Sequence, residues 1–189
     1  MRRASSTTIA LLVAGVLAGA GLAASTPSTL VSSLRSAAYP DISLPAAFSS
    51  ARVAGAPPAS HSRANGAVGE VDVDVDGPDP TAGIVFIVFR TAAGAQADLA
   101  NAPVATAGLA IHAAGKVVGH SPSAMFTGSI TQTDALNDAI THHVTVAAAV
   151  QGNVLVAGFT YAVSGAGNVH GALRLMTSGL NHLKKVSHS

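Results

Sequence analysis

The chain has 189 residues, no cysteine, a formal net charge of +1 and only 10% charged residues. Without cysteine it has no disulfides, thiolate metal sites or cysteine nucleophile. A nucleic-acid binder needs a basic stripe and stacking aromatics, and the ten scattered Lys and Arg residues, two Tyr and no Trp exclude that class of partner.

Residues 1–25 have the layout of a secretory signal peptide. Arg2 and Arg3 precede an uncharged apolar run over residues 9–24, which closes in small residues. This run is shorter than the about 20 apolar residues that a membrane-spanning helix needs, so we expect export and cleavage, with an uncleaved anchor as the alternative. The arginine pair also invites a twin-arginine interpretation, but Ala4, Ser5 and Ser6 stand where that signal has hydrophobic residues. We therefore predict a secreted or extracytoplasmic protein of the cell envelope.

The next segment, residues 26–65, is rich in Ser, Ala and Pro and has no sustained hydrophobic period. Such a composition predicts a disordered linker. Its apolar side chains are denser than those of a pure linker, which leaves open that part of it docks onto the domain or onto a partner. These side chains are Leu30, Val31, Leu34, Tyr39, Ile42, Leu44 and Phe48.

Periodic order starts at residue 66, so residues 66–189 are the predicted single domain. Valines alternate with carboxylates over residues 71–76, which indicates a strand with its acidic side chains on one face. A continuous apolar run over residues 84–89 indicates a central strand. Thr91 is placed to cap a short helix over residues 92–100.

The middle of the domain is predicted to be mostly strand. Residues 104–112 and 125–131 are strand candidates, and residues 133–140 are expected to form one or two helical turns. Residues 142–150 and 154–163 are rich in β-formers and are joined by Gln-Gly-Asn, where Gly and Asn tolerate the backbone of a tight turn. This pair is the clearest hairpin in the chain.

The last element is an amphipathic helix that begins after Asn168, a suitable N-cap. Its apolar residues recur at spacings of four and three and form one stripe that faces the core. The stripe consists of Val169, Leu173, Met176, Leu180 and Leu183. The order of elements predicts an α+β fold, a mostly antiparallel β-sheet with the short helix and the C-terminal helix packed on one face.

An acidic run that begins at Asp72 matches the first half of a calcium loop, with oxygens at alternate positions and Gly77 for the turn. The second half does not match, because Gly83 stands where a bidentate Glu belongs. A solvated acidic strand face is the simpler interpretation, and weak calcium binding is the alternative. The candidate metal ligands are Asp72, Asp74, Asp76 and Asp79.

Three further patterns fall short of a catalytic or cofactor site. The stretch 119–123 resembles a nucleophile elbow, but Pro122 lacks the N–H that an oxyanion hole uses. The glycines from Gly165 onward resemble a dinucleotide loop, yet no strand follows their helix. No two histidines have the i, i+4 spacing of a zinc helix, and His142 and His143 point to opposite faces of a strand. We predict no catalytic residue and no cofactor.

The order of elements, with the hairpin Val-Gln-Gly-Asn-Val-Leu-Val at residues 150–156 and a closing amphipathic helix, is similar to exported sensor-like and lipoprotein-like domains of actinobacterial envelopes. The resemblance covers residues 83–186. Those domains usually carry cysteines around the hairpin, and this chain has none. The resemblance implies fold and location only and transfers no functional residue.

We therefore expect an exported, non-enzymatic binding or interaction module, whose partner is an envelope protein or a small ligand. An uncleaved N-terminus would add peripheral membrane association. The first alternative is a small secreted hydrolase with a dispersed site, which a pocket gathering His112, His120 or His142 with an Asp would indicate. The second alternative is weak calcium binding through residues 72–79.

Overall fold

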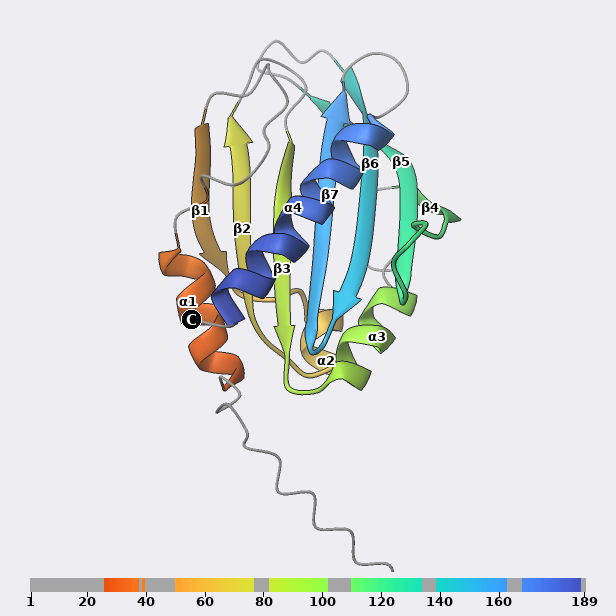
Figure 1. Ribbon diagram of the computed structural model, residues 1–189. Coiled ribbons are helices and arrows are strands. Elements are labelled where there is room, and N and C mark those ends of the chain that lie inside the picture. The colour runs from red at the N-terminus through yellow and green to blue at the C-terminus, as the bar shows by residue number, and fades with distance from the viewer. Residues whose placement is uncertain are drawn as a thin grey trace, which may run out of the picture.

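The computed structural model describes residues 26–37, 39, 50–76, 82–101, 110–133, 139–162 and 168–187. The strands are β1 (Ser50–Ala56), β2 (Ala67–Asp76), β3 (Ala82–Phe89), β4 (Ala110–Gly115), β5 (Ser123–Thr133), β6 (Ala139–Gln151) and β7 (Val154–Ala162). The helices are α1 (Pro27–Ser36), α2 (Ser60–Ala64), α3 (Ala92–Asn101) and α4 (Val169–Ser187). The strands form one antiparallel sheet in the order β1-β2-β3-β7-β6-β5-β4 (Figure 1). The predicted α+β class with a mostly antiparallel sheet is confirmed.

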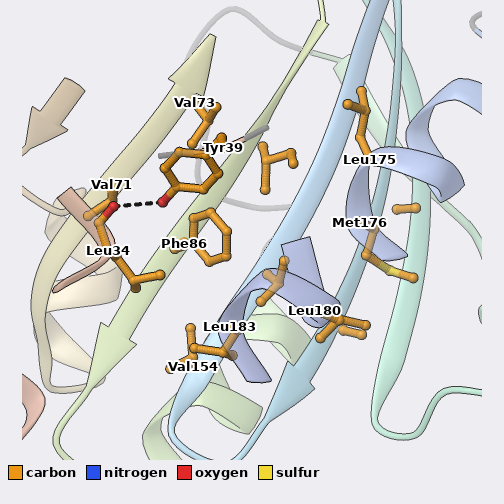
Figure 2. Packing of buried hydrophobic residues seen from close by; sticks show 14 of the residues in the cluster. Leu34, Tyr39, Val71, Val73, Phe86, Val154, Leu175, Met176, Leu180 and Leu183 are labelled. Carbon is orange, nitrogen blue, oxygen red and sulfur yellow. Dashed lines mark hydrogen bonds between the residues drawn. The ribbon is translucent and has the colours of Figure 1, made fainter. Parts of the chain in front are cut away.

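One face of the sheet is covered by α4, which crosses it diagonally, and by α1 at the β1–β2 side (Figure 1). Side chains alternate between the faces along each strand, so Val71 and Val73 of β2 share this face with Phe86 and Ile84 of β3, which lie opposite them. These four side chains are fully buried and pack with Leu175 of α4 in the main core (Figure 2). Burying a side chain of this size stabilises the fold by about 1.5–3 kcal/mol.

Glycines let α4 lie directly on the sheet. A Cβ on Gly158 of β7 would overlap the backbone O of Ala172 and the backbone N of Met176. A Cβ on Gly179 of α4 would lie 2.7 Å from Val156 Cγ1, closer than real Cβ atoms approach. The line of closest contact between helix and sheet therefore passes through positions that carry no side chain.

The predicted stripe on α4 is confirmed at Met176, Leu180 and Leu183, which are buried, whereas Val169 and Leu173 are half-buried. The difference follows from the glycine contact, because the buried side of the helix is centred on its small residues. The remaining buried residues of α4 are Gly171, Ala172, Leu175, Gly179 and His182. The predicted N-cap is confirmed as well, since Asn168 Oδ1 accepts the N–H of Gly171 at 2.8 Å.

α3 packs on the other face of the sheet. Ala95 and Leu99 of α3 belong to a second cluster, with Leu155 of β7. The next residue, Val156, belongs to the core beneath α4, and neighbouring residues of a strand point to opposite faces. The expectation that both helices pack on one face is therefore wrong. The mostly alanine surface of α3 gives no signal of the face it covers.

Residues 26–65 are not a linker in the part that the structure describes. α1 buries three of the apolar residues noted in the sequence, Leu30, Val31 and Leu34. The Tyr39 hydroxyl donates to the backbone O of Leu34 at 2.7 Å (Figure 2), and the Tyr39 ring stacks on His182 of α4 with centroids 4.0 Å apart. β1 pairs with β2 from Ser50 to Ala56. The domain therefore begins well before residue 66.

The predicted signal peptide, residues 1–25, lies outside the described residues, and other predicted elements lie partly outside them. Of the strand predicted at 104–112, residues 110–112 belong to β4, which continues to Gly115. Of the helical turns predicted at 133–140, residues 133, 139 and 140 lie in strands instead. Within the described ranges, no helix has both the length and the apolar character needed to span a bilayer.

Candidate functional site

The predicted metal ligands begin on an inner strand of the sheet. Asp72 and Asp74 lie on β2, between β1 and β3, and face away from α4. Asp76 is described in its backbone only, as the last residue of β2, and Asp79 lies outside the described residues. The described half of the predicted calcium loop is therefore extended strand. Among the described residues, no group of three or more His, Asp or Glu side chains is placed to hold a metal ion.

The acidic face of β2 is half-buried rather than fully solvated, and this raises the proton affinity of its side chains. Burial, then the charges of Asp72 and Asp98, raise the pKa of Glu70 to about 7, against a hydrogen bond to the Ala59 backbone that lowers it. Burial, then the charge of Asp74, raise the pKa of Asp72. Charge on this face is costly because it is partly removed from water.

A polar cluster that no sequence pattern indicates joins α2 to α3. Asp98 of α3 is 2% exposed and accepts a hydrogen bond from Ser62 Oγ at 3.1 Å and another from Asn65 Nδ2 at 2.9 Å. His61 Nε2 lies 3.2 Å from Ser62 Oγ and 3.8 Å from Asp98 Oδ1. A catalytic relay needs the nucleophile and the carboxylate on different ring nitrogens, whereas here one nitrogen faces both. Ser62 is also fully buried, so the cluster holds α2 against α3.

The histidines named for the hydrolase alternative do not meet. His120 lines a hollow of about 300 Å³ between the β4–β5 connection and α4, with Met125 and Leu173 among its other walls. His112 lines a different hollow, over strands β4, β5 and β6. His142 points to the opposite face of β6 from its neighbour His143. Neither hollow has a carboxylate among its described lining residues.

The stretch that resembles a nucleophile elbow is a closed turn. Ser123 is 9% exposed, and its hydroxyl donates to the backbone O of His120 at 2.7 Å. The same oxygen lies 3.1 Å from both the backbone N and the backbone O of Val117. Ser123 therefore holds the turn closed, and Ser121, the serine at the nucleophile position of the pattern, is exposed on that turn.

A hollow of about 350 Å³, lined mainly by residues with polar side chains, lies where α4 begins, over strands β4, β5 and β6. We call it the α4 hollow. Its lining residues are His112, Thr127, Gly128, Ser129, His143, Val144, Thr145 and Val169. It lies on the same face of the sheet as α4, beyond the apolar core that the helix covers.

Strand register builds the floor of the α4 hollow. Thr127 of β5 lies opposite His112 of β4 on one side and opposite Thr145 of β6 on the other. Thr160 of β7 lies opposite Thr145 and completes the row. Directly opposed side chains share a face with their Cβ atoms about 4.5–5.5 Å apart. One histidine and three threonines therefore form a continuous row across four strands.

The hydroxyl of Thr145 has no hydrogen-bond partner, although the residue is only 1% exposed. Its neighbour Thr160 is satisfied, since its hydroxyl donates to the backbone O of Asn168 at 3.2 Å. A buried hydroxyl without a partner costs about 1–3 kcal/mol. The alternating polar residues of β6, Thr141, His143 and Thr145, are a sequence signal that could have indicated this surface.

Comparisons with known proteins assign no residue role to this chain. No family model and no curated protein matches it. A solved structure, the extracellular domain of PknH from Mycobacterium tuberculosis, is similar with a TM-score of 0.45 and 14% sequence identity, over 74% of this chain and 81% of that one.

Proposed function

We propose that the chain is an exported, non-enzymatic binding module and that its ligand site is the α4 hollow. The observation that carries the proposal is the buried, unpartnered hydroxyl of Thr145 among the lining of this hollow. Native folds satisfy nearly all buried polar groups, so such a group suggests an absent ligand atom. Export is supported by Arg2, Arg3 and the apolar run over residues 9–24.

The geometry favours binding over catalysis. A hydrolase of the alternative kind needs a nucleophile, a base and a group that orients the base. The α4 hollow offers hydroxyls and imidazoles without a carboxylate among its described lining. The Ser62–His61–Asp98 cluster has the right residue types, but Ser62 and Asp98 are buried and the connectivity is wrong.

A paired experiment tests this proposal on the purified chain. A library of small polar compounds is screened by amide chemical shifts, and the same preparation is screened for hydrolase turnover. We expect at least one compound to shift the amides of Thr127, Thr145 and Val169, with no turnover. Turnover that is abolished by substituting one Ser, His or Asp would overturn the proposal.

A further inference from the structure

We propose that the α4 hollow binds a small oxyanion, either a carboxylate or a phosphate group. This inference rests on the proposed function and adds the chemical class of the ligand. It follows from the side chains of the hollow, from the end of α4 and from the unpartnered hydroxyl of Thr145.

The polar side chains of the hollow are hydrogen-bond donors without a negative charge. Thr127, Ser129 and Thr145 each carry a hydroxyl, and His112 and His143 each have a ring nitrogen that donates in either tautomer. The described carboxylates of β2 lie on the opposite face of the sheet, because Asp72 and Asp74 alternate with the valines beneath α4. A cationic ligand would find no carboxylate in the described lining.

The N-terminus of α4 adds a favourable field for negative charge. Val169, the first residue of this 19-residue helix, lines the hollow, and the first turn of the helix contains no acidic residue. The first backbone N–H groups of a helix and its dipole attract anions. The positive end of α4 is therefore not offset by a carboxylate in its own first turn.

Thr145 supplies the independent observation that points to a ligand. Its side chain lies on the hollow's side of the sheet, between Thr127 and Thr160, and is 1% exposed. Because Thr160 already donates to Asn168, the hydroxyl of Thr145 is the donor in this row that is buried and unused. An oxyanion oxygen that entered above the row would accept from it, while Thr127 and His143, which are half-buried, would donate beside it.

The test is an amide-shift titration of the full chain with inorganic phosphate and, separately, with acetate, each at constant ionic strength against chloride. We expect saturable shifts at Thr127, Thr145 and Val169 with at least one of the two ions. Saturation by phosphate alone would assign the phosphate class, and saturation by acetate alone the carboxylate class. Shifts that chloride reproduces, or no saturation with either ion, would overturn the inference. Binding of a neutral compound at the same amides would still leave the proposed function standing.

Variants separate a ligand contact from a structural role. Thr145→Val keeps the shape and removes the hydroxyl, so we expect about tenfold weaker oxyanion binding with an equal or higher melting temperature. His143→Asn should also weaken binding, whereas His142→Asn, the matched control on the opposite face of β6, should not. Unchanged affinity in both Thr145→Val and His143→Asn would refute the site. If Thr145→Val does not fold, Thr127→Val at the half-buried neighbouring position gives the same measurement.

Discussion

Gly158→Ala tests how closely α4 lies on the sheet. The added Cβ would overlap the backbone O of Ala172 and the backbone N of Met176, and neither atom can move unless the helix moves. Overpacking a tight contact costs about 1–3 kcal/mol, and a clash with backbone on both sides places the expected cost at the upper end, about 3 kcal/mol. For a domain of this size each kcal/mol lowers the melting temperature by roughly 2–4 °C, so we expect a loss of about 10 °C.

The matched control is Gly55→Ala in β1. There the new Cβ would overlap the end of the Arg35 side chain, which is flexible and can swing away. Replacing glycine where the backbone allows it stabilises a protein by about 0.4–1 kcal/mol through the unfolded state, so this variant should melt at or above the temperature of the parent chain. Urea and thermal unfolding of both variants provide the comparison. Equal melting temperatures for the two would refute the contact between α4 and Gly158.

Three further substitutions test other parts of the account. Tyr39→Phe removes the hydrogen bond to the backbone O of Leu34 and leaves that buried carbonyl without its donor. We expect the free energy of unfolding in urea to fall by about 1–3 kcal/mol. An unchanged urea midpoint would mean that residue 39 does not anchor α1. Asn168→Ala removes the N-cap of α4 and should cost about 0.5–2 kcal/mol, with no loss if the cap is not formed in solution. Glu70→Gln tests the pH dependence of stability. The pKa of Glu70 in the folded chain is raised to about 7, so the folded chain holds more protons than the unfolded chain between about pH 4.5 and 7. Stability therefore falls as pH rises through this window. The variant should flatten that fall by on the order of 1 kcal/mol, since the side chain is only half-buried, and an unaltered pH profile would contradict the shift.

The parts of the fold that the sequence predicts are those with a local signal. The alternation of valine and aspartate in β2, the turn between β6 and β7 and the N-cap of α4 are each written within a few residues. β1 carries no such signal, because its sequence is mostly small and its place at the edge depends on pairing with β2. The buried side of α4 differs from the predicted stripe for a similar reason. Gly158 and Gly179 determine where the helix contacts the sheet, and glycine adds nothing to a hydrophobic pattern in the sequence.

The candidate site was less predictable because strand register assembles it. His112, Thr127 and Thr145 are far apart in the chain and become neighbours only through the pairing of β4, β5 and β6. The cluster around Asp98 likewise joins residues 36 and 33 positions apart. Sequence reasoning did place His142 and His143 on opposite faces, because that follows from the period of a strand alone.

We propose that this chain binds a ligand in the α4 hollow and does not turn it over. The most direct measurement is the map of amide chemical shifts for the purified chain with inorganic phosphate and with acetate. The account predicts saturable shifts centred on Thr127, Thr145 and Val169 that weaken in Thr145→Val. Shifts centred instead on Glu70, Asp72 and Asp74, or chemical conversion of the bound compound, would contradict it.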